Sequence, residues 1–317
     1  MTQDNKKELI DILSRLGTEQ VNPDTMDIDT LSPLDIVRKI NNEDKKVARV
    51  VEKALPQIAV AAETAASTLK NGGRIIYMGA GTSGRLGVLD AAECPPTYGT
   101  DPSQVVGLIS GGYETLLLSK EGAEDHADWA RSDLDRIGVK ARDFIIGIAA
   151  SIRTPYTLSG VEYAASKGCH TALIVCNKAD ILKFKPDILI ELPVGAEAIT
   201  GSTRMKSGTA QKMTLNMITT AAMILIGKTY GNLMVDLQAR SEKLESRSRK
   251  ILMDFLGIEY DEADRLLKEA GGSVKIAIVM KKFGISRAAA AGILSEAGNF
   301  LRKTLEKKED GTSHPPK

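Results

Sequence analysis

Short runs of apolar residues alternate with helix-length segments through the middle of the chain. Each run is almost wholly apolar, which is typical of a strand buried on both faces of a sheet. Alternation of this kind predicts an α/β fold, a doubly wound parallel five-stranded sheet covered by helices. The predicted strands are Arg74–Met78, Val105–Ile109, Phe144–Ala149, Thr171–Cys176 and Ile188–Leu192.

Two of the segments between these strands predict long helices, Tyr113–Asp135 and Pro155–Lys167. Ligands of doubly wound sheets bind beyond the carboxyl ends of the strands, near the point where the strand order reverses. The loops that follow the strands are therefore where a functional site is expected.

The C-terminal part of the chain has helical periodicity and no predicted strand from about Ser241 onward, which predicts a small C-terminal helical domain. Ser273 and Ser286 are suited to cap two of its helices, because a serine hydroxyl accepts a hydrogen bond from a free N–H group of the first turn. The predicted helices are Ile251–Phe255, Asp261–Ala270, Ser273–Lys282 and Ser286–Leu305, with breaks at Gly257, Gly271, Gly272 and Gly284.

On this pattern the chain divides into four parts. The pattern of about the first fifty residues predicts charged helices, and Ser32 followed by Pro33 is a helix start signal. Its last residues are polar. We predict an N-terminal helical arm at 1–55, the α/β domain at 56–240, the small helical domain at 241–306 and a disordered tail at 307–317.

The composition narrows the class of protein. The chain of 317 residues is 43% hydrophobic and 26% charged, which is ordinary for a globular protein, and its formal net charge of +1 argues against nucleic-acid binding. No apolar run is long enough to cross a membrane, and the first residues lack the apolar core of a signal peptide. The three cysteines and three histidines have no metal-ligand spacing, so we expect no metal, and free thiols in a chain without a signal indicate the cytoplasm.

The segment Gly79–Gly84 is a glycine- and hydroxyl-rich turn directly after the first predicted strand. Such a turn directs backbone N–H groups at an anion, and Thr82 and Ser83 suit a terminal phosphate. It also matches the dinucleotide pattern G-x-G-x-x-G, but that interpretation requires an acid at the end of the second strand, where Ser110 stands. A sugar phosphate is therefore favoured over a dinucleotide, and a tight turn without a ligand is the alternative.

Two further loops carry similar chemistry. One follows the third strand and contains Ser151 and Thr154; the other, Gly195–Lys212, precedes an apolar helix-like run. Each loop alone would be ordinary turn chemistry, but three on one sheet indicate a phosphate site. The predicted phosphate- and substrate-binding residues are Gly81, Thr82, Ser83, Ser151, Thr154, Glu197, Ser202, Thr203, Arg204 and Lys206.

Glu93 stands among Ala91, Ala92, Cys94 and Pro95. Apolar neighbours predict a dry environment, in which a carboxyl group stays protonated near neutral pH and can act as a general acid. Cys94 has no histidine near it in the sequence, so we interpret it as a small buried apolar side chain rather than a nucleophile.

Four segments together resemble a known family. GAGTSGRLGVLDAAECPPTYG at 79–99, EGAED at 121–125, RTPY at 153–156 and GAEAITGSTRMKSGTAQK at 195–212 are similar to the N-acetylmuramic acid 6-phosphate etherases. That family has the SIS (sugar isomerase) fold and is related to the glucokinase regulatory protein. The resemblance runs from about Leu31 into the helical C-terminal region.

The resemblance implies a concrete activity. These etherases cleave the D-lactyl ether at C3 of N-acetylmuramic acid 6-phosphate and release N-acetylglucosamine 6-phosphate and D-lactate. They act in peptidoglycan recycling in the bacterial cytoplasm, without a cofactor and as homodimers. We expect the N-terminal arm of this chain to pack across the partner in such a homodimer.

The family's two catalytic glutamates correspond to Glu93 and Glu124. Our hypothesis is that Glu93 protonates the departing lactate oxygen and that Glu124 removes the C2 proton. From the sequence alone Glu124 would be a solvated helix acid, because Glu121, Asp125 and Asp128 surround it. Only the resemblance indicates a catalytic role for it.

Two other functions stay open at this point. A non-enzymatic sugar-phosphate sensor, like the regulatory relative, would be about twice as long and carry two such domains. An aldose–ketose isomerase shares the C2 proton chemistry but needs no acid at a C3 ether.

The chain departs from the family at Ile152, where the pattern Ser-Gly-Arg-Thr-Pro has glycine. A β-branched residue cannot easily adopt positive φ. Either this loop keeps an ordinary backbone, or it contributes less to phosphate binding.

Overall fold

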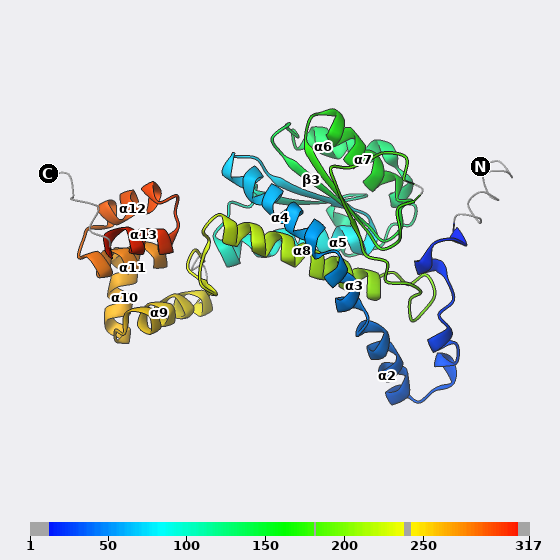
Figure 1. Cartoon of the computed structure of the whole chain (residues 1–317), viewed down its shortest axis with the longest axis horizontal. Helices are drawn as coiled ribbons and strands as arrows, with labels where there is room; N and C mark the ends of the chain where they lie inside the picture. Colours follow the sequence, from blue (N-terminus) through cyan, green and yellow to red (C-terminus); the bar gives the residue numbers. More distant parts are fainter. Residues whose placement is uncertain (1–12, 181, 238–241, 310–317) are drawn as a thin grey trace. The chain divides into compact units, whose positions relative to one another are not determined.

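The structure is a computed structural model that describes residues 13–180, 182–237 and 242–309 (Figure 1). The chain forms two compact units. The first comprises residues up to Ala91 together with Ser103–Thr219, and the second comprises Ala92–Pro102 together with the chain from Thr220 onward. The domain boundaries proposed from the sequence remain predictions. Residues 310–317 of the predicted tail lie outside the described residues.

A parallel sheet with the strand order β2-β1-β3-β4-β5 forms the centre of the first unit. The predicted fold class is thereby confirmed, and each strand begins and ends within one residue of the prediction. All residues of β1 and β3 are buried, as expected for strands covered on both faces. The five strands are β1 Ile75–Gly79, β2 Val105–Ile109, β3 Phe144–Ala149, β4 His170–Val175 and β5 Ile188–Glu191.

Helices cover both faces of this sheet (Figure 1). On one face Ile76 and Met78 share a buried core with side chains of α6 and α7. On the other face Tyr77 lies against α5, where an added Cβ on Gly87 would come within 2.8 Å of its Cβ. The helices of this unit that contact or continue from the sheet are α4 Leu55–Lys70, α5 Gly81–Tyr98, α6 Ala127–Arg136, α7 Pro155–Ser166 and α8 Lys206–Leu225.

The helix predicted over Tyr113–Asp135 is wrong for its first half. The segment instead forms the 3-10 turns η4 (Tyr113–Leu116) and η5 (Ala123–Asp125) before α6 begins. Gly112 and Gly122 have φ of 83° and 76°, a conformation that interrupts a helix. The segment therefore folds back toward the end of β2 rather than continuing along the sheet.

The N-terminal arm comprises η1 (Gly17–Glu19), η2 (Pro23–Thr25), η3 (Ile28–Thr30), α2 (Pro33–Asp44) and α3 (Val47–Lys53). Ser32 caps α2 as predicted, since its hydroxyl accepts from the backbone N–H of Asp35.

The base of this arm is bonded to loops of its own chain. Asn22 donates to the carbonyl of Ala196 at 3.2 Å, and the hydroxyl of Thr25 donates to the carbonyl of Ala198 at 2.9 Å. These loops lie beyond the carboxyl end of β5, so the arm starts beside the functional edge of the sheet.

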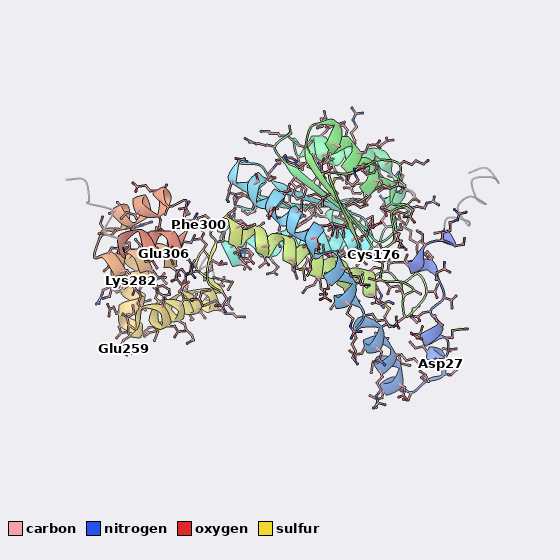
Figure 2. All side chains as sticks on the ribbon, in the orientation of Figure 1. Asp27, Cys176, Glu259, Lys282, Phe300 and Glu306 are labelled. Atoms are coloured by element: carbon pink, nitrogen blue, oxygen red, sulfur yellow. The ribbon has the colours of Figure 1, made fainter. Side chains whose placement is uncertain are left out.

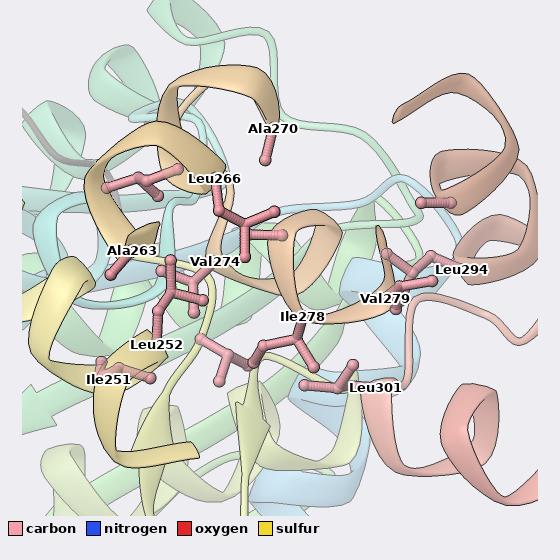
Figure 3. Close-up of a cluster of buried hydrophobic side chains, with 14 of the residues drawn as sticks. Ile251, Leu252, Ala263, Leu266, Ala270, Val274, Ile278, Val279, Leu294 and Leu301 are labelled. Carbon is pink, nitrogen blue, oxygen red and sulfur yellow. The ribbon is translucent and has the colours of Figure 1, made fainter. Parts of the chain in front are cut away.

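The second unit contains a helical bundle with its own apolar core (Figure 3). Ser273 and Ser286 cap α11 and α12 as predicted. The helix predicted over Ser286–Leu305 is two helices, because Gly298 and Asn299 have positive φ and break it. The elements are β6 Thr229–Tyr230, β7 Leu233–Met234, α9 Glu242–Leu256, α10 Tyr260–Glu269, α11 Val274–Phe283, α12 Arg287–Glu296 and α13 Leu301–Glu309.

Close packing of β2 on α5 gives a first testable prediction. A Cβ added to Gly107 would lie 2.6 Å from the Cα of Val88, a backbone atom that cannot move aside. We expect Gly107→Ala to lower the free energy of unfolding by about 1–3 kcal/mol through overpacking. Urea denaturation measures the loss.

Gly208→Ala is the matched control, because its Cβ would meet its nearest neighbour at an ordinary 3.5 Å. Equal destabilisation of both variants would contradict the packing argument.

Candidate active site

The strand order reverses between β1 and β3, so the loops that follow these two strands diverge to opposite sides of the sheet. Gly79 at the end of β1 pairs in register with Ile148 at the end of β3. The predicted phosphate turn and the loop containing Ser151 therefore begin side by side at the carboxyl edge of the sheet.

The predicted phosphate turn is unusually tight. Only Ala80 separates β1 from α5. A Cβ on Gly84 would lie 2.6 Å from the carbonyl oxygen of Gly79. The strand and the first helical turn can approach this closely only because Gly84 has no side chain. Gly81 is exposed and Thr82 half-buried at this helix start. The first N–H groups of α5, which have no partner within the helix, are thus placed at the sheet edge where an anion can bind them.

The first turn of α8 lies beside that of α5. The Ser83 hydroxyl donates to the side-chain oxygen of Gln211 at 3.0 Å, and both side chains are buried. Gly208 faces Thr82, and an added Cβ there would lie 3.5 Å from the threonine methyl group. A hydrogen bond from the Gln211 side chain also opposes the rise in the pKa of the buried Cys176 thiol. Two helix N-termini therefore meet at one place.

A buried acid fixes α5 against its neighbours. The Asp90 carboxylate accepts from the Tyr77 hydroxyl at 2.9 Å and from the Asn216 side chain of α8 at 2.7 Å. Burial raises the pKa of Asp90, although these hydrogen bonds oppose the shift. The network joins β1, α5 and α8, so it holds the two helix starts in register.

Glu197 is placed at the start of α8. Its fully buried carboxylate accepts from the backbone N–H groups of Lys206 and Ser207 at 2.8 and 2.9 Å, and from the Ser207 hydroxyl at 2.8 Å. The N-terminus of α8 is therefore already neutralised by a carboxylate of its own chain. This leaves the start of α5 as the better position for a ligand phosphate, and the predicted contact of Glu197 with substrate remains a prediction.

Lys206 forms a buried ion pair with the arm. Its Nζ lies 2.6 Å from Oε2 of Glu43 in α2, and both side chains are 3% exposed. Burial alone would raise the pKa of Glu43, but hydrogen bonds from Lys206 and Lys46 outweigh it and lower that pKa. In the loop before Lys206, Ser202 and Thr203 are half-buried and Arg204 is exposed.

The loop after β3 keeps an ordinary backbone. Ile152 does not have positive φ, which Asn299 alone shows among the non-glycine residues described. Its side chain is 4% exposed and packs in the core cluster that includes Leu16. The loop therefore accommodates Ile152 with an ordinary backbone, which is the first of the two alternatives for this position. Ser151 and Thr154 are half-buried beside it.

Glu124 lies in η5, beyond the carboxyl end of β2, and its side chain is exposed. The Ser110 hydroxyl donates to the carbonyl of Ala123 at 2.6 Å, and the Ser110 N–H donates to the carbonyl of Gly79 at 3.0 Å. These bonds tie the Glu124 segment to the end of β1. The structure thus brings Glu124 to the same edge of the sheet as the start of α5.

Glu93 lies on α5 within the second unit. The dry environment predicted for it is wrong for the single chain, in which Glu93 is exposed while Cys94 is 2% exposed. Adjacent residues of a helix point in different directions, so the apolar neighbours of Glu93 in sequence do not surround its carboxyl group.

The cysteines are all free and buried. Cys176, labelled in Figure 2, directly follows β4. Burial raises the pKa of its thiol to about 12. Across the described ranges there is no group of side chains that could hold a metal ion, and no helix there is long and apolar enough to cross a membrane.

The sequence did not point to Glu43, Asp90 or Gln211, since nothing in the local pattern distinguishes a buried polar residue from a surface one. Arg85, which directly follows the glycine turn, was also not singled out by the sequence pattern.

The parallel sheet, its reversal of strand order and the helix start at that point define an α/β domain of the SIS type. The family model of the glucokinase regulatory protein N-terminal SIS domain matches residues 57–165. A phosphoheptose isomerase from Francisella tularensis has a TM-score of 0.43 and 19% identity, over 62% of this chain and 98% of that chain.

Closer relatives cover nearly the whole chain. N-acetylmuramic acid 6-phosphate etherase 2 of Vibrio cholerae is 49% identical over 302 residues, which are 95% of this chain and 98% of the relative. The etherase of Cronobacter sakazakii is 50% identical over 294 residues, 93% of this chain and 99% of its own. The chain therefore belongs to the N-acetylmuramic acid 6-phosphate etherase family and is an enzyme of that type, as its sequence segments indicated.

The ion pair between the arm and α8 gives a second prediction. We expect Glu43→Gln to destabilise the protein by about 3–5 kcal/mol at neutral pH, because the Lys206 charge is left buried and unpaired. The pKa of Glu43 is lowered in the folded state, so its contribution is present above about pH 4.5 and is lost as the pH falls through the folded-state value.

Chemical denaturation between pH 7 and pH 3 checks this prediction. The difference in stability between wild type and variant should shrink on acidification. A difference that stays constant over this range would contradict it.

Proposed function

We propose that this chain cleaves the D-lactyl ether of N-acetylmuramic acid 6-phosphate and releases N-acetylglucosamine 6-phosphate and D-lactate. The proposal extends to a place in peptidoglycan recycling in the bacterial cytoplasm. The observation that carries it is the arrangement at the sheet edge, where the free N-terminus of α5 and the Glu124 segment lie on adjoining strands. The relatives, about half identical along the whole chain, bear that substrate in their names.

The 6-phosphate would bind at the start of α5. Backbone N–H groups and the helix dipole favour an anion there, and Gly81, Thr82 and Ser83 surround the position. Ser151 and Thr154 at the neighbouring strand end are placed to extend the same contact. Gln211 of α8 accepts from the Ser83 hydroxyl and holds that side chain in place.

The reaction needs one base and one acid. Opening of the sugar ring exposes an aldehyde at C1, which makes the C2 proton removable. Glu124, whose side chain is exposed, would act as the base and remove that proton, and the electrons left at C2 would expel the lactyl oxygen from C3. Glu93 would act as the acid and donate a proton to the departing lactate. Glu93 would then take a proton from the water that adds to C3, while Glu124 returns its proton to C2, which restores both carboxyl groups.

A homodimer is part of the proposal. Glu93 is exposed in the single chain, so the water exclusion that an acid of this kind requires would come from a partner or from the substrate. The α2 helix exposes Leu34 and Val37, each 56% accessible, although its base is bonded to its own chain. Exposed apolar residues on a projecting helix suit a second copy of this chain.

Separate substitutions of the two glutamates give the third prediction. Glu93→Gln should lower the rate of lactate release by about 10²–10⁴-fold, the typical contribution of a positioned acid or base, while exchange of the C2 hydrogen with heavy water continues. Glu124→Gln should abolish both processes. Lactate assays and NMR of the C2 position measure them.

Glu121→Gln is the control, since Glu121 is an exposed acid of the same segment. Full lactate release by Glu93→Gln would end its assignment as the acid.

The fourth prediction concerns assembly. Light scattering at micromolar concentration should give the mass of a dimer for the wild type and a smaller mass for Val37→Glu, because a buried, unpaired charge at an interface is costly. The conservative variant Val37→Ile should remain dimeric. A monodisperse wild-type monomer would refute the assembly.

A further inference from the structure

The segment that carries Glu124 has little regular structure of its own. Between the end of β2 and the start of α6 it contains only the 3-10 turns η4 and η5. Leu117 and Leu118, between these turns, are 89% and 78% exposed. Because these apolar side chains pack against almost nothing, burial does not hold this part of the segment in place.

Besides the bond from the Ser110 hydroxyl to the carbonyl of Ala123, two sets of contacts hold the ends of the segment. At one end the Thr115 hydroxyl donates to the carbonyls of Ser110 and Gly112 at 3.1 and 2.7 Å. At the other end the His126 ring stacks on the Trp129 ring, with the two centroids 3.9 Å apart. The Lys120 ammonium lies 4.9 Å from the centroid of the Trp129 ring. All of these residues belong to the segment or its immediate neighbours in sequence.

A third contact comes from the helix that begins at the phosphate turn. Arg85 of α5 donates from Nε to the carbonyl of Leu116 at 3.0 Å, and from Nη2 to the carbonyl of Thr115 at 2.5 Å and to the Ser119 hydroxyl at 3.3 Å. No carboxylate forms an ion pair with Arg85 within the part of the chain that the structure describes. Its donors therefore serve the segment rather than an acid.

The guanidinium group suits this task. Its planar, rigid arrangement of donors reaches three acceptors between Thr115 and Ser119 at once, whereas a lysine ammonium is a single point charge on a flexible stem. Arg85 also stands two positions after Ser83 on the same helix. Arg85 therefore fixes the position of the segment relative to the helix turn proposed to hold the phosphate.

We infer that Arg85 is a positioning residue for Glu124: it fixes the 113–125 segment on α5 so that the base meets C2 of a sugar anchored at the start of the same helix. The inference rests on the proposed function, because it takes Glu124 as the base and the start of α5 as the phosphate site. Arg85 itself acts through the backbone of the segment and takes no part in proton transfer.

The test compares Arg85→Lys and Arg85→Ala with Arg131→Lys, an exposed arginine of α6 that serves as the matched control. For Arg85→Lys we expect faster amide hydrogen exchange confined to residues 113–125 and an unchanged melting temperature. Its kcat should fall by about 10–100-fold, the cost of a misplaced catalytic group, with a much smaller change in KM. Added methylguanidinium should restore part of the kcat of Arg85→Ala.

These readouts separate positioning from a general structural role, which would lower the melting temperature and resist rescue. Wild-type kcat in Arg85→Lys, or faster exchange of the segment without loss of kcat, would overturn the inference while leaving the proposed function intact. Wild-type C2 exchange in Glu124→Gln would instead remove the proposed base, and the inference would fall with it.

Discussion

The contact between the end of β1 and the first turn of α5 is the constraint on which the site depends. Gly79 and Gly84 allow strand and helix to approach to a distance that any Cβ would forbid. The helix therefore starts one residue after the strand, and its free N–H groups stand at the edge where the strand order reverses. A larger residue at either position would move the helix start away from that edge.

Charge is distributed so that one helix start stays available. Glu197 occupies the N-terminus of α8, and Lys206 beside it is neutralised by Glu43 of the arm. The start of α5 has no such internal carboxylate in the described structure, although it lies against the same turn of α8. The two adjacent helix N-termini therefore differ: the start of α8 binds the Glu197 carboxylate of its own chain, whereas the start of α5 can bind an anion.

The strands were predictable because a buried parallel strand needs an apolar side chain on both faces, and this requirement is written locally in the sequence. The structure of the Glu124 segment was not predictable in this way. Its sequence has helical periodicity, but Gly112 and Gly122 adopt positive φ. Ser110, just before the segment, and Arg85, on a different helix, bind its backbone. The periodicity of apolar residues carries no information about hydrogen bonds of that kind.

The sequence by itself determined the class of fold, the family and the identity of the polar residues near the phosphate turn, since strand burial, helix caps and glycine turns depend on neighbours along the chain. Only the tertiary structure decided which of those residues are buried, exposed or paired within the chain. Glu197 and Lys206 turned out to be engaged by their own chain, and Glu93 turned out to be exposed. Burial and pairing arise from contacts between residues far apart in sequence, so no local pattern could assign them.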